Sequence, residues 1–255
     1  MNILDYETIF DYRGESYNSA CDKFPEARHF ERQALIDLID LRSDLQIVDA
    51  PAGGGYLADG IREIGDDSLT ISCIEPAANF GKRIHSSFAV INSPIDNIPL
   101  ADSSIDLVAS LAGLHHIPDR APVFKEWARL LKPGGQIAVA DVAAGSGPDE
   151  FLNGFVDQYT PQGHDGIFIE NHEFSTLFQK HGLEPQQDKV VSVPWLFDSH
   201  QDLAEFCTKL FYLVQVEPEQ VLTAVDKCVG IKNFGDKVGM EWELRYASGI
   251  RTENV

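Results

Sequence analysis

The stretch IVDAPAGGGYLAD, residues 47–59, decides the fold of this chain. It begins as an apolar, β-branched run, passes through three consecutive glycines and continues into a segment of helical character. This order is typical of a buried strand, a tight turn and a helix. The backbone N–H groups of such a turn lie at the carboxyl edge of a parallel sheet, where they can bind a ligand.

The spacing of the glycines narrows the kind of ligand. Gly53, Gly55 and Ala58 fit the pattern G-x-G-x-x-A of dinucleotide-binding turns, and an acid, Glu75, follows twenty residues after Gly55. An acid at the end of the next strand can hold the hydroxyls of a ribose. The alternative interpretation is a plain tight turn that binds nothing.

On both sides of this stretch, runs rich in Val, Ile and Ala alternate with helical periods, as in a parallel sheet covered on both faces. The predicted strands are residues 45–50, 69–75, 88–92, 105–111 and 135–142. A helix is predicted over 26–41, and the segment before it is expected to be a mobile flap. Further along, we predict a helix at 173–183, a strand at 188–197, two helical periods at 200–229 and a last strand at 238–247.

Charge excludes two classes of partner. Lys and Arg number 20 against 40 Asp and Glu, so the formal net charge is −20 at pH 7. A field of this sign repels phosphate backbones and anionic lipid headgroups. Neither nucleic acid nor a membrane is therefore expected as a partner.

Neither export nor a metal centre is expected. The first twelve residues contain three acids and no base, unlike a signal peptide, and no apolar run approaches about 18 residues. The four cysteines are far apart and form no C-x-x-C pair, so no zinc or redox site is expected and no metal is assigned. A cytoplasmic location follows as the expectation.

Residues 47–142 resemble the class I S-adenosylmethionine-dependent methyltransferases of the small-molecule type. VDAPAGGG at 48–55 is similar to the family's first motif, with Pro51 where a glycine is usual, and CIEP at 73–76 is similar to the second. LLKPGGQIAVADV at 130–142 is similar to the family's helix end, turn and fifth strand. The resemblance implies S-adenosylmethionine as the cofactor. It implies that the donor is bound by Asp49, Ala50, Gly53, Gly55, Glu75, Pro76, Ile95, Asp96, Ser110, Leu111 and Tyr17.

The adenine contact departs from the family pattern. Relatives place Gly-Asp-Ala shortly before the segment that matches Ile98-Pro99-Leu100, whereas this chain has Ser93-Pro94-Ile95 there. By resemblance, Asp96 would reach the exocyclic amine of adenine, and the Ile95 N–H would meet a ring nitrogen. The alternative is that Asp96 is a solvated loop acid.

Two histidines are the candidates for catalysis. Methyl transfer from a sulfonium is an in-line displacement, and an alcohol, phenol or ammonium acceptor must also lose a proton. Leu114-His115-His116 follows the predicted fourth strand, and imidazole suits this task at neutral pH. Phosphobase methyltransferases use a histidine in a similar context, so His115 is the first candidate and His116 the second. The alternative is that one histidine packs and the other caps a helix from Asp119.

The acceptor pocket is expected under a roof formed by residues 145–172 and 198–235. Tyr17, just before the first predicted helix, is the candidate lid residue, and its alternative role is packing on the sheet edge. Aromatic residues and histidines in the two roof segments suggest a small acceptor with an apolar part. The residues in these two segments are Phe155, Tyr159, His164, His172, Phe206, Phe211 and Tyr212. Trp195 and Phe197, at the end of the strand predicted just before the second segment, are added to them.

The resemblance implies an α/β fold. This fold is a doubly wound, mostly parallel, seven-stranded Rossmann-like sheet with an antiparallel last strand and helical insertions over its carboxyl edge. A length of 255 residues without a linker favours a single methyltransferase domain, 1–255. Its expected parts are a lid and helix at 1–41, a cofactor-binding core at 42–142, helical cap insertions at 143–172 and 198–235, and the last strand at 238–248.

The leading hypothesis is methyl transfer from S-adenosylmethionine to oxygen, nitrogen or carbon of a small-molecule acceptor. The alternatives are an NAD(P)-dependent oxidoreductase built on Gly53, Gly55 and Glu75, and a non-catalytic protein that binds S-adenosylmethionine. The small-molecule acceptor is the expected partner, and a homodimer remains open.

Overall fold

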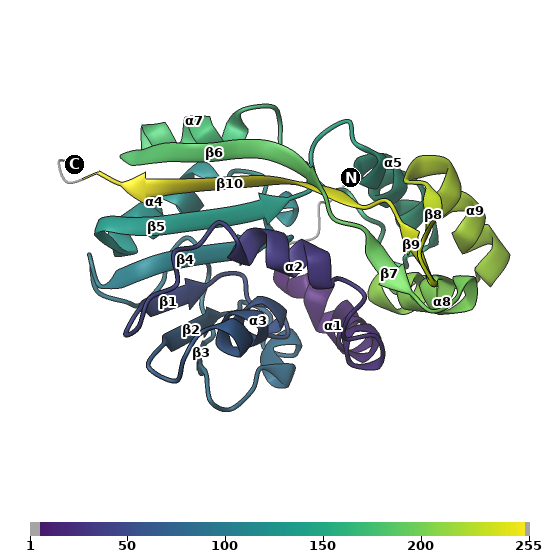
Figure 1. The fold of residues 1–255 in the computed structure, drawn as a ribbon, viewed down its shortest axis with the longest axis horizontal. Coiled ribbons are helices and arrows are strands. Elements are labelled where there is room, and N and C mark those ends of the chain that lie inside the picture. Colours follow the sequence, from purple (N-terminus) through teal and green to yellow (C-terminus); the bar gives the residue numbers. More distant parts are fainter. Residues whose placement is uncertain (1–5, 253–255) are drawn as a thin grey trace.

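The computed structural model describes residues 6–252, and residues 1–5 and 253–255 lie outside the described part. Its centre is a seven-stranded sheet, which crosses the middle of Figure 1. In space the strands follow the order β3-β2-β1-β4-β5-β10-β6. Their bounds are β1 (Gln46–Asp49), β2 (Thr70–Ile74), β3 (Ala89–Ile91), β4 (Ile105–Leu111), β5 (Leu131–Asp141), β6 (Leu183–Ser192) and β10 (Glu243–Arg251).

Strand directions confirm the predicted fold class. β10 runs antiparallel to both of its neighbours, β5 and β6, and the other neighbouring strands pair in parallel. β1 and β4 are largely buried because helices cover both faces of the sheet. Since the parallel strands share a direction, their carboxyl ends meet at one edge. The candidate residues that follow those ends are therefore brought together.

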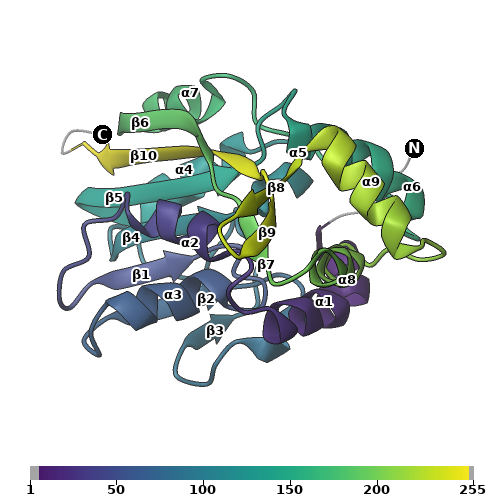
Figure 2. The same ribbon diagram turned by 45° about the vertical axis from the view of Figure 1, so that its right-hand side comes forward.

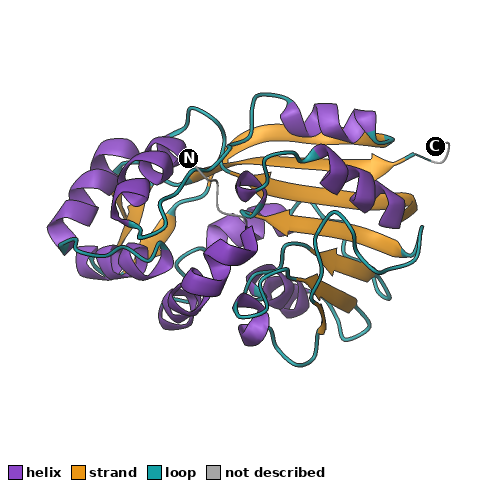
Figure 3. Cartoon of the chain, turned by 180° about the vertical axis from the view of Figure 1, so that it is seen from behind, coloured by secondary structure: helices purple, strands orange, loops and turns teal. Residues whose placement is uncertain are grey.

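Helices cover both faces of the sheet. α2 (His29–Ile36) and α3 (Tyr56–Ile64) lie on the face shown in Figure 1. α4 (Ala121–Leu130) and α7 (Glu173–Lys180) lie on the opposite face, which Figure 3 turns forward. Two short 3-10 helices, η1 (Phe80–Arg83) after β2 and η2 (Leu114–His116) after β4, lie near the carboxyl edge.

A cap, residues 143–172 and 195–240, extends beyond the carboxyl edge (Figure 2). The two helices expected within 200–229 are present and separate at Pro218, which begins the second of them. The helical elements of the cap are α5 (Gly147–Glu150), the π-helical turn η3 (Phe151–Val156), α6 (Asp157–Tyr159), α8 (His200–Leu210) and α9 (Pro218–Cys228). Its small sheet has the order β7-β9-β8, with bounds Trp195–Phe197, Lys237–Met240 and Ile231–Phe234.

The expected N-terminal flap is instead a helix, α1 (Tyr6–Lys23). This helix packs along α8, as Figure 2 shows, and buries Tyr6, Ile9 and Phe10. The helix predicted over 26–41 is shorter than expected, because α2 ends at Ile36. Helical stability comes mostly from tertiary packing, so the partner of α1 in the distant cap was not visible in its local sequence.

Two predicted strands are each divided between the large and the small sheet. The strand expected at 188–197 becomes the end of β6 and then β7, because Pro194 has no N–H to donate to a ladder. The last strand expected at 238–247 is divided between β9 and β10 around Trp242. β8 also lies inside a segment that was expected to be helical. It joins β9 through a turn at Gly235, whose φ is 67°.

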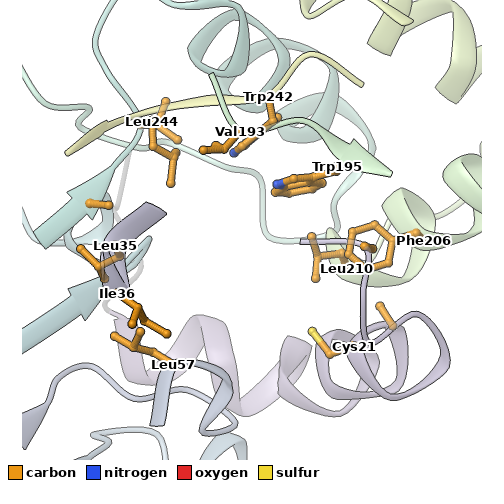
Figure 4. Packing of buried hydrophobic residues seen from close by; sticks show 14 of the residues in the cluster. Cys21, Leu35, Ile36, Leu57, Val193, Trp195, Phe206, Leu210, Trp242 and Leu244 are labelled. Atoms are coloured by element: carbon orange, nitrogen blue, oxygen red, sulfur yellow. The ribbon is translucent and has the colours of Figure 1, made fainter. Parts of the chain in front are cut away.

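The apolar core continues from the sheet into the cap. Figure 4 shows Leu35 of α2 on one side and Trp195, Trp242 and Phe206 on the other. The Trp195 ring packs on Trp242 with centroids 4.4 Å apart and meets Phe206 edge-on at 5.6 Å. Its Nε1 donates a hydrogen bond to Glu31 Oε2 at 2.7 Å. Trp195 therefore fixes the cap to α2.

Replacing Trp195 with alanine should lower the free energy of unfolding by about 3–5 kcal/mol, the usual cost of removing a large buried aromatic side chain. The urea midpoint followed by circular dichroism measures this loss. Tyr12→Ala is the control, because Tyr12 is 66% exposed, and it should change the free energy by less than about 0.5 kcal/mol. Similar midpoints for the two variants would contradict the role given to Trp195.

Candidate functional site

The glycine turn between β1 and α3 forms the first part of the site. Gly53 and Gly55 have φ values of 54° and 86°, a region that L side chains rarely adopt. A Cβ at Gly53 would also lie 3.0 Å from the ring of Phe80. Asp49, the last residue of β1, is buried and accepts a hydrogen bond from the Ala58 N–H at 3.2 Å. Burial raises the pKa of this carboxyl well above its ordinary value.

Glu75 follows β2 and is 1% exposed. Its Oε2 accepts hydrogen bonds from the Gly53 N–H at 2.7 Å and from the Tyr6 hydroxyl at 3.0 Å. Its Oε1 accepts one from the Ala77 N–H at 2.8 Å. Burial raises the pKa of Glu75 to about 7, although these hydrogen bonds act to lower it. The carboxyl is thus positioned to accept hydrogen bonds from hydroxyl groups, and one hydroxyl, that of Tyr6, already reaches it.

The remaining residues expected to bind the donor lie in or beside two neighbouring cavities. Leu111 lines a cavity of about 40 Å³ together with Asp49 and Gly53. Beside it, the Ala50 N–H donates to the Ala109 carbonyl and Ser110 Oγ is buried without a partner among the described residues. Pro76, Ile95 and Asp96 line a second cavity, of about 470 Å³, and Tyr6 and Pro51 line both.

Asp96 is exposed, and the structure places it at the rim of the larger cavity. Ile95 is buried, and its carbonyl accepts a hydrogen bond from Trp127 Nε1 at 3.1 Å. The segment that departs from the family pattern therefore still lies at the expected place.

α1 covers the site. Phe10 stacks on Phe80, with ring centroids 4.6 Å apart, and Tyr6 lies between the two cavities. The hydroxyl of Tyr17 accepts a hydrogen bond from Arg28, and burial raises the pKa of Tyr17 to about 12. Tyr17 lines the cavity at Asp49 and also the cavity at His115, and its role as a lid stays a prediction. Tyr6 was missed, because nothing in the local sequence links it to an acid 69 residues away.

His115 forms a buried pair with Asp141, the last residue of β5. The Nδ1 of His115 lies 2.6 Å from Asp141 Oδ1. Asp141 Oδ2 accepts hydrogen bonds from the backbone N–H groups of Leu114 and His115, at 2.6 and 3.0 Å. Burial acts to raise the pKa of Asp141, yet the His115 imidazole, the Val142 N–H that donates to Oδ1 and the charge of Arg120 hold it below its ordinary value. Because a carboxylate can only accept, the Nδ1 of His115 carries the proton and its Nε2 has the lone pair.

His116 and His164 lie against His115, with ring centroids 4.1 and 5.5 Å from it. Burial lowers the pKa of both well below the ordinary value, and the neighbouring His115 lowers it further. The buried guanidinium of Arg13 faces the same cavity, of about 70 Å³, and burial lowers its pKa to about 10. Of these residues, the sequence indicated His115 and His116 as catalytic candidates, and it gave no sign that Asp141 would pair with His115.

The alternative in which a histidine caps the helix after Asp119 is wrong. The Asp119 carboxylate itself accepts the Ala121 N–H, the first of α4, at 3.0 Å, and the side chain of the N-cap residue, Arg120, makes no cap hydrogen bond. The aromatic roof is present in part. Of the residues expected there, His164, Trp195 and Phe211 line the cavity, whereas His172 is exposed.

Comparison with known proteins finds similarity to methyltransferases. A methyltransferase domain family matches residues 48–139. The chain is 32% identical over 166 residues to 27-O-demethylrifamycin SV methyltransferase of Amycolatopsis mediterranei, covering 62% of this chain and 61% of that one. It is 28% identical over 125 residues to malonyl-[acyl-carrier protein] O-methyltransferase of Pectobacterium atrosepticum, covering 49% of each chain. The match thus spans less than two thirds of either relative.

The fold is shared with a crystal structure from Thermotoga maritima, described as an S-adenosylmethionine-dependent methyltransferase and possible histamine N-methyltransferase. The TM-score is 0.64 at 19% identity, with 97% of this chain and 100% of that chain covered. Within residues 6–252, no helix is both long and apolar enough to cross a bilayer. The family match over residues 48–139, the named relatives and the sheet topology together support a class I S-adenosylmethionine-dependent methyltransferase with a Rossmann-like fold.

Proposed function

We propose that this protein transfers the methyl group of S-adenosylmethionine to an oxygen of a small-molecule acceptor. The observation that carries the proposal is the position of two cavities on either side of one wall. The cavity at Asp49 and Gly53 and the cavity at His115 are both lined by Phe10, Tyr17, Arg28 and Ala112. A donor in the first cavity would present its methyl group to an acceptor in the second, the geometry that in-line displacement needs.

We assign the donor site residue by residue, on the family resemblance and the geometry together. The carboxylate of Glu75 holds the ribose hydroxyls, at the oxygen that now accepts the Tyr6 hydroxyl. The methionine part lies at the glycine turn beside Asp49, and the adenine lies in the larger cavity at Asp96. The other donor contacts are Ala50, Gly53, Gly55, Pro76, Ile95, Ser110 and Leu111, with Tyr17 as the lid.

Glu75→Ala should weaken the binding of S-adenosylmethionine about 10- to 100-fold, because charge-assisted hydrogen bonds to a buried acid contribute roughly 1.5–3 kcal/mol. Isothermal titration calorimetry measures this change. Glu184→Ala in β6 is the matched control, since Glu184 is exposed and lies on the far strand of the sheet. Unchanged affinity in Glu75→Ala, or tight NAD binding by the unmodified chain, contradicts the donor site.

Donor affinity should also depend on pH through Glu75. Its pKa of about 7 is raised by burial, and hydrogen bonds from two ribose hydroxyls favour the ionised form. Binding therefore releases a proton below that pKa, and affinity should rise from about pH 5 to about pH 7 and then level off. Calorimetry across this range tests the expectation. In Glu75→Gln this pH dependence should be lost, and an unchanged slope in that variant counts against the assignment.

The acceptor side favours an oxygen that must lose a proton. The Nε2 of His115 carries the lone pair, because Nδ1 is held by Asp141. A buried carboxylate behind an imidazole stabilises the imidazolium that forms when a proton is taken up. A neutral amine, or a carboxylic acid that is already ionised at neutral pH, would need no such pair, whereas an alcohol or a phenol would. Both named relatives act on oxygen according to their names, which agrees with this choice.

His115→Gln should lower kcat by about 10²-fold or more, the usual scale for removing a general acid or base, while donor affinity stays nearly unchanged. Asp141→Asn should also lower kcat, because the orienting acceptor is altered. His116→Gln tests the second candidate in the same assay. His200→Gln is the matched control, since His200 is exposed at the start of α8. Full activity in His115→Gln and His116→Gln would falsify the role of the pair.

The cysteines are consistent with a cytoplasmic enzyme. All four are free thiols, and Cys21, Cys73 and Cys207 are buried. Thiols of secreted proteins usually form disulfides, whereas the reducing cytoplasm keeps them free. We therefore propose a cytoplasmic location for the reaction.

A further inference from the structure

The three histidines of the acceptor cavity have the arrangement of a metal site. One ring nitrogen from each of His115, His116 and His164 can be chosen so that all three lie within 4.8 Å of one another. His115 and His164 are buried and His116 is half-buried. We infer that these side chains bind a divalent transition-metal ion whose open coordination position faces the acceptor.

Hydrogen bonds to two of the histidine rings determine which ring nitrogen is left to bind a metal ion. Asp141 accepts from the Nδ1 of His115. Asn153 is held in one orientation because its Nδ2 donates to the Gly166 carbonyl and its Oδ1 accepts the Gly166 N–H, both at 2.8 Å. The Nδ1 of His164 lies 3.1 Å from that same Oδ1, so Nδ1 carries the proton. In both rings Nε2 is left as a ligand. Metal-binding histidines are typically oriented in this way by a carboxylate or carbonyl oxygen.

The donor set and its dimensions suit zinc and similar ions. Imidazole nitrogens bind zinc, copper, iron and nickel. A tetrahedral ion with bonds of about 2.0–2.1 Å needs nitrogens about 3.4 Å apart, which is shorter than the 4.8 Å within which one nitrogen of each ring lies here, so the rings must move closer together to bind it. Three protein ligands leave the fourth position open, as in catalytic zinc sites.

The surroundings indicate what occupies the open position. The histidines and Arg13 line the same cavity, and Arg13 Nε is buried without a partner in the described part of the chain. A cation beside a metal ion favours an anionic oxygen ligand, such as a phenolate, an enolate or a carboxylate. The inference thus deepens the acceptor side of the proposed function. A bound metal would lower the pKa of an oxygen ligand, so that the acceptor loses its proton to water, and Nε2 of His115 would hold the ion instead of accepting that proton.

The test is a titration with Co²⁺ of the whole chain, produced without a histidine tag and stripped by chelator. We expect one ion per chain and the visible absorption bands of tetrahedral Co²⁺. His115→Ala, His116→Ala and His164→Ala should each weaken binding more than about 100-fold, beyond the 10- to 100-fold expected for Asn153→Ala as an outer partner. His172→Gln and His200→Gln, at exposed positions, should leave the Co²⁺ affinity unchanged. Retained bands in His164→Ala, or no stoichiometric binding by the unmodified chain, would overturn the inference.

Further measurements distinguish the loss of the metal site from misfolding of a variant and from failure of the proposed function. The affinity of each histidine variant for S-adenosylmethionine, measured by calorimetry, shows whether the variant is folded. This control does not depend on metal binding. Azide should change the Co²⁺ spectrum of the unmodified chain if the fourth position is open, and an unchanged spectrum overturns that part. Methyl transfer that survives chelation and stays sensitive to His115→Gln overturns the metal's role and leaves the proposed function standing.

Discussion

A buried ion pair between Arg28 and Glu31 organises the meeting point of the sheet, α1 and the cap. Glu31 is fully buried; it accepts hydrogen bonds from Arg28 and from the indole of Trp195, and its carbonyl accepts one from the Tyr246 hydroxyl. Arg28 also donates to the hydroxyl of Tyr17. Such a pair adds little net stability against an apolar replacement, but removing one partner typically costs about 3–5 kcal/mol. Its effect is to fix how the sheet, α1 and the cap face one another. Arg28 and its partner Tyr17 also form part of the wall between the two cavities.

A second buried carboxylate, that of Asp141, joins separate segments on the proposed acceptor side, as Glu31 does at α2. Asp141 ends β5 and binds both the backbone of η2 and the ring of His115, so it joins the ends of two neighbouring strands. The parallel arrangement of β4 and β5 makes this contact short. His164 then arrives from the cap, where Asp157 holds its backbone N–H and Asn153 holds its ring. Core and cap thus contribute to one cluster of polar groups, which explains why both must keep their relative position.

Local sequence was sufficient to bring together most residues of the proposed donor site, but insufficient for the proposed acceptor side. Asp49, Gly53 and Glu75 belong to one strand, turn, helix and strand in succession, so their spacing alone predicted where they meet. His164 joins His115 only because the cap folds back over the sheet, and that packing depends on contacts between distant segments. The same reason explains the errors in the fold. α1 is stabilised by α8, and the divided strands are set by pairing within the small sheet.

The bond between Tyr6 and Glu75 has a kinetic consequence. Its acceptor oxygen is the one that we assign to the ribose, so two occupants compete for one position and α1 must move before the donor is fully bound. The apparent dissociation constant is then the intrinsic one divided by the fraction of molecules with Tyr6 displaced. Each tenfold preference for the Tyr6-bound arrangement withholds about 1.4 kcal/mol of binding free energy. On the proposed donor site, the demethylated product needs the same movement to leave, so the opening rate of α1 would set an upper limit on turnover.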